Sequence, residues 1–258
     1  MTKKLAFFDI DGTLLDHNKK LPDSTVKTIN DLQQQGVYCA IATGRAPFMY
    51  ETIRADLGIT SFISFNGQYV VLEGTPVYKN PLNHKELDSL YEKAIQNNHP
   101  VVFMNEETMR ATRTGSERIR QALQSLHFDY PSIDDKYHEK RDMYQSLLFC
   151  EGNEIESYKE SHRAFDYIRW HKYSCDIIPR GGSKAEGIRK LIEAADVDMS
   201  NVYAFGDGLN DVEMIRDVGT GIAMGNAVPE VKEVSDYVTD DVAEDGLMKA
   251  VYEVGLLN

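Results

Sequence analysis

The sequence predicts a doubly wound α/β protein with a mostly parallel sheet and a separate α+β domain inserted into it. Short apolar runs alternate with helical patterns near both ends of the chain, and this alternation is typical of parallel sheets. Between them, residues 82–179 replace the alternation with amphipathic helices and paired short strands. We therefore predict a core made of residues 1–81 and 180–258, and an inserted domain made of residues 82–179.

The first part of the core should contain three strands and two helices. The apolar runs, helix start signals and glycine stop signals place the expected elements in this order: a strand at 5–8, a hairpin flap at 13–21, a helix at 22–36, a strand at 37–42, a helix ending at Gly58 and a strand at 61–65. Asn66-Gly67 then marks a hairpin turn, and short strands should lead to Pro81.

The remaining elements follow from the same periodicities. In the inserted domain they are a helix around 87–95, strands at 101–104 and 109–112, a helix around 119–126, a strand at 144–150, a helix at 154–162 and strands at 165–170 and 174–178. The α/β alternation then resumes with a helix at 184–195, a strand at 202–205, a helix at 209–216 and a strand at 221–224. Boundaries of such elements are the least certain part of the prediction.

Composition excludes several classes of protein. A net charge of −13 and a pI near 5.0 argue against a general affinity for nucleic acid or for an anionic membrane. Three separated cysteines suit a reducing compartment, and no segment is typical of a signal peptide or a membrane span. We expect a soluble cytoplasmic protein whose partner is a small molecule, and which is a monomer or a weak dimer.

Two acidic residues follow the first predicted strand. Asp9 and Asp11 come directly after the apolar run Leu5–Phe8 and precede Gly12. Their side chains leave the strand in the same direction, because strand side chains alternate. Neighbouring carboxylates repel each other unless a cation or a proton separates them. The end of this strand therefore predicts a metal ion, a shared proton, or both.

A second acidic pair follows a later strand. Asp207 lies at the end of the strand at 202–205, and Asp211 lies in the next turn. With Asp9 and Asp11 they supply four carboxylates, without histidine or cysteine, which suits Mg²⁺ rather than zinc. The alternative, equally open for this pair alone, is that Asp207 and Asp211 are ordinary turn and capping residues.

Thr43-Gly44 and Lys184 are candidates for binding an anion. Thr43 and Gly44 offer a hydroxyl and backbone N–H groups at the end of a strand where a helix begins, although Thr43 could equally be that helix's N-cap. Ser183 and Glu186 form a capping box around Lys184, which places its cation at the positive end of the helix dipole. An anion in front of this helix would offset that unfavourable position.

In these residues the chain resembles the haloacid dehalogenase (HAD) superfamily of phosphohydrolases. The four signatures of that superfamily occur in order: Asp9-Ile10-Asp11-Gly12-Thr13, then Thr43, then Lys184, then Gly206-Asp207 with Asn210-Asp211. The inserted domain lies between the second and third signatures, like the C2B caps of the Cof-type branch. The resemblance covers the whole chain and implies a Rossmann-like core with a cap.

The resemblance also implies a role for each residue. Asp9 would be the nucleophile that forms an aspartyl-phosphate, and Asp11 would be the general acid and base. Mg²⁺ would be held by the Asp9 side chain, the Asp11 backbone carbonyl and Asp207, supported by Asp211. The phosphate oxygens would be held by the following groups: Thr43, Gly44, the Ile10 backbone, Lys184 and Asn210. Arg45 would reach the substrate, and Arg110, Arg113 and Trp170 are candidates in the cap.

The activity implied is Mg²⁺-dependent hydrolysis of small phosphate monoesters, such as sugar phosphates, pyridoxal phosphate or flavin mononucleotide. Two alternatives stay open at this stage. A phosphomutase would use the same aspartyl-phosphate but return the phosphoryl group to its substrate. A phospho-aspartate signalling or binding protein would keep the modified Asp9 without turnover, although such receivers need only about half of this length.

Overall fold

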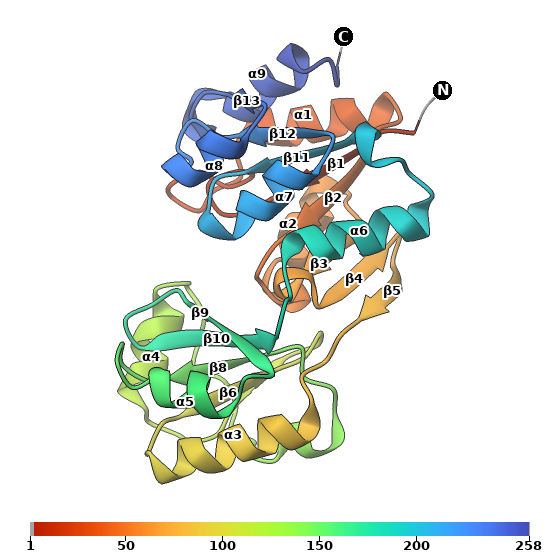
Figure 1. Cartoon of the computed structure of the whole chain (residues 1–258). Helices are drawn as coiled ribbons and strands as arrows, with labels where there is room; N and C mark the ends of the chain where they lie inside the picture. The colour runs from red at the N-terminus through yellow and green to blue at the C-terminus, as the bar shows by residue number, and fades with distance from the viewer. Residues whose placement is uncertain (1–2, 258) are drawn as a thin grey trace. The chain divides into compact units, whose positions relative to one another are not determined.

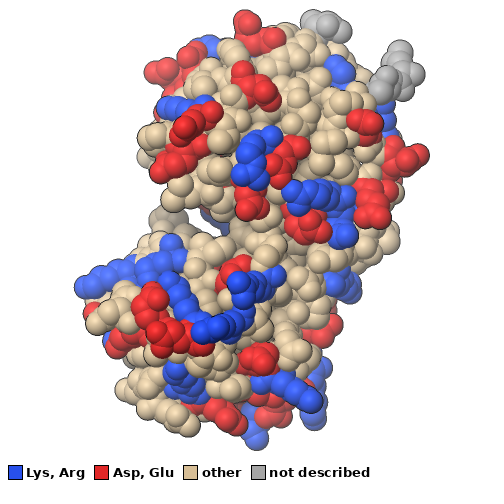
Figure 2. Space-filling model, viewed as in Figure 1, with Lys and Arg blue, Asp and Glu red and all other residues tan. Residues whose placement is uncertain are grey.

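The computed structural model describes residues 3–257, which divide into two compact units. We call residues 3–45, 49–78 and 183–257 the core unit, and residues 46–48 and 79–182 the inserted unit. The core unit is a mixed α/β fold with a mainly parallel sheet, so the predicted fold class is confirmed. In residues 3–257 no helix combines the length and apolar character needed to cross a membrane. On the face shown in Figure 2, acidic and basic side chains are interspersed over both units.

The core unit is built on an eight-stranded sheet in the order β13-β12-β11-β1-β2-β3-β4-β5 (Figure 1). The strands, in chain order, are β1 (Leu5–Phe8), β2 (Tyr38–Ala42), β3 (Ser61–Ser64), β4 (Tyr69–Leu72), β5 (Thr75–Lys79), β11 (Val202–Gly206), β12 (Thr220–Ala223) and β13 (Tyr237–Val238). All pairings from β13 to β3 are parallel, and β4 turns back antiparallel to β3. The two parallel neighbours of β1 are β2 and β11, so the strand order reverses there.

Helices cover both faces of this sheet. On one face, α6 (Lys184–Ala195), α7 (Val212–Asp217) and α8 (Pro229–Val234) bury apolar side chains against β1, β2 and β11. α1 (Asp23–Gln34) contacts β2, α9 (Gly246–Glu253) and α2 (Glu51–Leu57), and Figure 1 shows α1 and α9 on the other side of the sheet. Open sheets of this kind bind ligands beyond the carboxyl ends of their strands, where the strand order reverses. That point lies between β1 and β11.

The inserted unit has a five-stranded antiparallel sheet in the order β7-β6-β8-β10-β9. Its elements are α3 (His84–Gln96), β6 (Val101–Met104), β7 (Met109–Ala111), α4 (Glu117–Gln124), β8 (Gln145–Phe149), α5 (Glu156–Ser161), β9 (Phe165–Arg169) and β10 (Ser174–Pro179). Side chains of α3 and α5 pack on one face of this sheet to form a second hydrophobic core, so the inserted unit has a core of its own.

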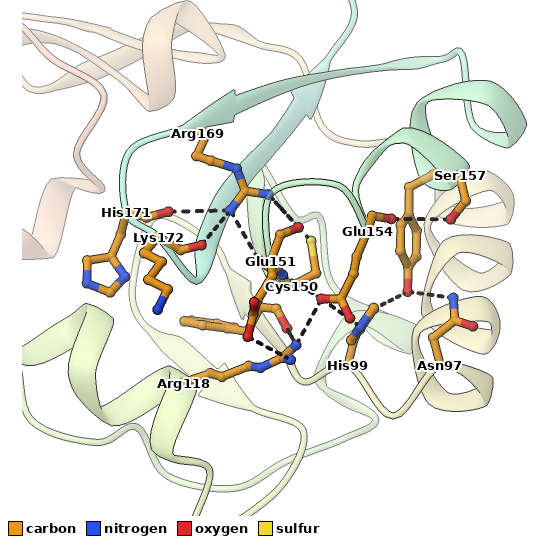
Figure 3. Close-up of polar contacts among 12 residues, drawn as sticks. Asn97, His99, Arg118, Cys150, Glu151, Glu154, Ser157, Arg169, His171 and Lys172 are labelled. Carbon is orange, nitrogen blue, oxygen red and sulfur yellow. Dashed lines mark hydrogen bonds and ion pairs between the residues drawn. The ribbon is translucent and has the colours of Figure 1, made fainter.

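A polar network joins several elements of the inserted unit (Figure 3). The buried His99 Nδ1 lies 2.8 Å from the Tyr158 hydroxyl, and His99 Nε2 lies 3.3 Å from Glu154 Oε2. Arg118, on α4, reaches the same carboxylate at 3.3 Å. Arg169 donates to the carbonyls of residues 150, 151, 171 and 172. These contacts join α4, α5 and the end of β9 to the loops before β6 and after β8.

The structure corrects several local expectations. The predicted hairpin flap after β1 consists of consecutive turns and one isolated bridge between Asp11 and Leu15. α2 begins only at Glu51, after a short 3₁₀ turn. Ile95, expected on the buried face of α3, is 56% exposed. Residues 229–253 form α8, β13 and α9, which were not predicted.

Gly221 in β12 lies where α7 packs closely against the sheet. A Cβ atom at this position would lie 1.9 Å from the carbonyl oxygen of Ile215 in α7. Because backbone on both sides has to move, Gly221→Ala should lower the free energy of unfolding by about 2 kcal/mol or more, measured by urea denaturation. Gly152→Ala is the control, since its Cβ would meet no atom within 4 Å. Equal stability of the two variants would contradict this packing.

Candidate active site

Polar side chains gather at the carboxyl ends of β1, β2 and β11, at the point where the strand order reverses. Asp9 and Asp11 follow β1, Thr43 follows β2, and Asp207 follows β11. The N-terminus of α6 brings Lys184 to the same edge. All of these residues belong to the core unit, so the topology of one sheet is sufficient to assemble them.

Lys184 lies at the centre of this group. It is the first residue of α6, and its predicted N-cap Ser183 accepts a hydrogen bond from the Glu186 backbone N–H at 3.3 Å. Its side chain is fully buried, and Nζ donates to Asp9 Oδ1 at 2.5 Å and to Asp211 Oδ1 at 2.6 Å. In this structure the cation at the helix N-terminus is therefore compensated by two carboxylates.

Asp211 has the capping role that the sequence left open, and it also pairs with Lys184. Its Oδ2 accepts hydrogen bonds from the backbone N–H groups of Asp207 and Gly208, at 3.0 and 2.9 Å, as a turn-capping residue does. Its Oδ1 binds Lys184. Since both oxygens are occupied and the residue is fully buried, Asp211 holds the loop that carries Asp207 and ties that loop to α6.

Asp207 is held from two sides. Thr13 Oγ1 donates to Asp207 Oδ1 at 3.2 Å, and Asn226 Nδ2 lies 3.3 Å from Asp207 Oδ2. Asn226 Nδ2 also donates to the Gly12 carbonyl at 2.8 Å. Asn226 was not among the predicted residues, because it lies after β12 and belongs to none of the recognised motifs. It links the turn after β1 to the loop after β11.

Three of these carboxylates are arranged in a way that suits a metal ion. Asp9, Asp207 and Asp211 can each offer one oxygen such that the three atoms lie within 4.8 Å of one another; within residues 3–257 this is the one cluster of that kind. The donors are hard carboxylate oxygens, the type that binds Mg²⁺, Mn²⁺ or Ca²⁺. One ammonium faces three carboxylates, so a divalent cation fits the charge of the site.

The ionisation of these groups reflects the same excess of negative charge. Burial raises the pKa of Asp9 to about 7, against the opposing effect of the Lys184 ammonium. Burial and the neighbouring Asp211 raise the pKa of Asp207 to about 6. Burial alone would lower the pKa of Lys184, but Asp211 and Asp9 outweigh it and raise that pKa. The ammonium is therefore charged throughout the neutral range.

Asp11 has a different environment from Asp9. Its carboxylate accepts two hydrogen bonds from Arg45, at 2.8 and 2.6 Å, and one from Lys19 Nζ at 2.7 Å. Burial would raise the pKa of Asp11, but the charges and hydrogen bonds of Arg45 and Lys19 lower it. Lys19 has a left-handed backbone with φ of 59° and was not among the predicted residues, because nothing in its sequence context points back to Asp11.

The predicted phosphate-binding residues are placed as follows. Thr43 is buried, and its Oγ1 accepts from the Arg45 backbone N–H at 3.2 Å. The alternative that Thr43 caps a helix is wrong, since α2 begins eight residues later. Ile10 is buried and its carbonyl accepts from the N–H groups of residues 14 and 15. Asn210 donates from Nδ2 to Asn66 Oδ1 at 3.2 Å.

The cap candidates have local partners in the inserted unit. Trp170 Nε1 donates to Asp176 Oδ1 at 2.6 Å. Arg110 donates to the Thr108 hydroxyl at 2.6 Å, and Arg113 to Asn98 Oδ1 at 2.6 Å. Each of the three predicted side chains thus forms a hydrogen bond with another residue of the inserted unit.

Comparison with known proteins gives consistent matches along the chain. A sequence profile of haloacid dehalogenase-like hydrolases matches residues 6–251. YkrA of Bacillus subtilis (strain 168), provisionally named a phosphatase, is 52% identical over 257 residues and all of both chains. YcsE of the same organism, a 5-amino-6-(5-phospho-D-ribitylamino)uracil phosphatase, is 28% identical over 254 residues, covering 96% of this chain and 94% of YcsE.

A solved structure extends the similarity to three dimensions. The HAD subclass IIB sugar phosphatase BT4131 superimposes with a TM-score of 0.85 at 27% sequence identity, covering 99% of this chain and all of BT4131. The likeness therefore includes the inserted unit as well as the core.

Removal of the central cation tests its role in stability. Lys184→Met leaves Asp9 and Asp211 buried without a counter-charge, which should cost about 3–5 kcal/mol of unfolding free energy at pH 8 without divalent cations. The folded variant takes up protons that the unfolded chain has released, because its carboxyl pKa values rise further. Its stability therefore increases as the pH falls, and urea denaturation should show a smaller deficit at pH 5 than at pH 8.

Lys190→Met is the matched control, on the same helix. Lys190 is partly exposed and pairs with Glu186 and Glu193, and its Nζ lies 5.6 Å from the centre of the Tyr78 ring. Such surface contacts are weak, so its loss should cost less than about 1 kcal/mol at either pH. A deficit of Lys184→Met that does not change with pH would contradict the ionic account.

Proposed function

The chain belongs to the haloacid dehalogenase-like hydrolases, in their Cof-type branch, as an enzyme acting on phosphoric monoesters, and on this basis we propose a Mg²⁺-dependent phosphatase that acts on small metabolites through an aspartyl-phosphate at Asp9. The observation that carries the proposal is that Asp9 and Asp11, two residues apart, have different charged partners. Asp9 accepts a hydrogen bond from Lys184 within the carboxylate cluster, whereas Asp11 accepts hydrogen bonds from Arg45 and Lys19.

In the first step Asp9 attacks phosphorus, the bond to the leaving oxygen breaks, and Asp11 donates a proton to that oxygen. In the second step Asp11 accepts a proton from water as the water attacks the same phosphorus, which releases phosphate and restores the Asp9 carboxylate. Arg45 and Lys19 favour the charged form of Asp11, which is the base of the second step. Donation in the first step requires a weaker hold on Asp11, and phosphate oxygens are competing acceptors for Arg45.

The carboxylate cluster would hold Mg²⁺. Asp9 and Asp207 would supply side-chain oxygens and Asp11 its backbone carbonyl, while Asp211, whose oxygens are already occupied, would support Asp207. The bound ion would offset the negative charge of the phosphoryl group in the transition state.

The remaining residues would bind the phosphoryl oxygens. Lys184 would contribute a charge, and neutral donors would come from the Thr43 hydroxyl, the backbone N–H groups of Ile10 and Gly44, and the Asn210 amide. Preorganised donors of this kind supply most of the stabilisation in phosphoryl transfer. None of these groups is assigned as an acid for the leaving oxygen or as a base for the attacking water, so both roles fall to Asp11.

For the substrate we propose a small phosphorylated metabolite, of the sugar phosphate or cofactor monophosphate class. The support is the similarity to YcsE and to the sugar phosphatase BT4131, whose names describe phosphorylated polyol or sugar substrates. No polymer or lipid surface is needed to explain the features of this site.

Replacement of the nucleophile tests the mechanism. With Mg²⁺ and an aryl phosphate, Asp9→Asn should lower the rate of phosphate release by about 10³-fold or more, since no aspartyl-phosphate can form. Asp11→Asn should release a burst of the aryl alcohol equivalent to the enzyme and then turn over slowly, because a good leaving group needs no acid whereas hydrolysis needs the base. Retained turnover in Asp9→Asn would contradict the mechanism, and a sugar phosphate isomer in place of free phosphate would indicate a mutase.

Loss of a metal ligand gives a separate test. Asp207→Asn should raise the Mg²⁺ concentration for half-maximal activity by about tenfold or more, and should weaken the Mg²⁺-dependent rise in Tm measured without substrate. Asp217→Asn is the control, because Asp217 ends α7 and pairs with Arg189 and Arg216 on the surface. An unchanged Mg²⁺ response of Asp207→Asn would exclude this residue as a ligand.

A further inference from the structure

We propose that Asn66, which belongs to none of the recognised motifs, is a positioning residue for phosphate recognition: its amide orients the Asn210 side chain and supports the Thr43-Gly44 turn. This inference rests on the proposed function, because it assigns a role within the same phosphate site. The sequence identifies Asn66-Gly67 only as a turn between strands. In the structure this turn does join antiparallel β3 and β4, but its contacts extend well beyond them.

The backbone of the turn is tied to the phosphate-binding loop after β2. The Asn66 N–H donates to the Thr43 carbonyl at 3.1 Å, and the Phe65 N–H donates to the Arg45 carbonyl at 3.2 Å. Phe65 and Asn66 both have left-handed backbones, with φ of 54° and 52°. Asparagine tolerates this conformation, but for a bulky phenylalanine it is strained. Strained backbone of this kind concentrates at functional sites.

The side chain of Asn66 selects one orientation of Asn210. A carboxamide has an oxygen that accepts and a nitrogen that donates, and only the nitrogen suits a phosphate. Asn210 is exposed, so burial does not fix the orientation of its amide. Its Nδ2 donates to Asn66 Oδ1 at 3.2 Å, which turns the nitrogen toward this side and leaves its second hydrogen for an anion. Asn66 itself is only 4% exposed, so the acceptor is fixed in place.

The same amide packs against the glycine of the phosphate-binding loop. A Cβ atom on Gly44 would lie 3.0 Å from Asn66 Nδ2 and 3.1 Å from Asn66 Oδ1. The next residue, Gly67, has φ of 101°, and a Cβ there would lie 2.1 Å from the Ser183 carbonyl. Ser183 precedes Lys184. One turn therefore touches the loop after β2, the start of α6 and the loop after β11, which are three of the segments that supply phosphate donors.

A double-mutant cycle tests the coupling. Asn66→Gly removes the amide and keeps a residue that adopts the left-handed backbone freely; Asn210→Ala removes the second amide. With Mg²⁺ and an aryl phosphate, each single variant should lower kcat/KM about tenfold, and the double variant should lose little more than either single one. The Kd of inorganic phosphate, measured by calorimetry, should rise in the same pattern.

Two further variants separate orientation from structure. Asn98→Gly replaces another left-handed asparagine, in the inserted unit, and should leave kcat/KM and the phosphate Kd unchanged. Asn66→Asp keeps an acceptor for Asn210 but places a charge beside Gly44. It should also weaken phosphate binding, and adding Asn210→Ala to Asn66→Asp should now cause a further loss.

The outcomes distinguish this inference from the proposed function. Additive losses in the Asn66→Gly and Asn210→Ala cycle, or an unchanged phosphate Kd in Asn66→Gly, would overturn the positioning role even with an active wild-type enzyme. Absence of phosphate release from every ester tried would overturn the proposed function, whereas the calorimetric cycle with inorganic phosphate would still decide the coupling. A fall in Tm without a change in phosphate Kd would reduce Asn66 to a structural residue.

Discussion

The buried ammonium of Lys184, held between Asp9 and Asp211, is the interaction on which the rest of the site depends. Burying a single charge is prohibitively expensive, so the chain brings the ends of β1 and β11 and the start of α6 to one place. Three carboxylates still face one ammonium, and this leaves a net negative charge at the reversal of the strand order. A divalent cation would offset that charge, and the cation together with Lys184 would then attract a phosphate dianion. The electrostatic requirement of the fold and that of the reaction thus coincide.

Asp9 and Asp11 follow β1 only two residues apart, but their neighbours shift their pKa values in opposite directions. Asp9 lies in the buried cluster where burial raises its pKa, and Asp11 lies under two cations that lower its pKa. Asp211 has two functions, because one carboxylate oxygen caps the loop that carries Asp207 and the other binds Lys184. Residues at this edge therefore serve folding and chemistry at once, and substitutions there affect both.

The sequence was sufficient for features that depend on local periodicity and spacing. The apolar runs predicted the parallel strands of the core, and the capping pattern placed Lys184 at the start of α6, where the structure has it. Ser183 makes its half of the predicted capping box, whereas the Glu186 carboxylate pairs with Arg189 and Lys190. Contacts between distant segments were not predictable in this way. Lys19 lies in the turns after β1 and reaches back to Asp11, eight residues earlier, and Asn226 donates to the carbonyl of Gly12, 214 residues away along the chain. No local pattern encodes such pairs.

Asn66-Gly67 shows how a correct local prediction can conceal a tertiary role. The pair favours a turn between two strands, and it forms one, so the sequence leaves nothing unexplained. A simple connection would not require a strained Phe65, a buried asparagine amide, or a glycine whose Cβ would overlap the Ser183 carbonyl. Each of these costs stability, and each brings the turn against a segment that carries a phosphate donor. A turn that only connected β3 to β4 would need none of these contacts, and this supports the proposal that Asn66 also serves phosphate recognition.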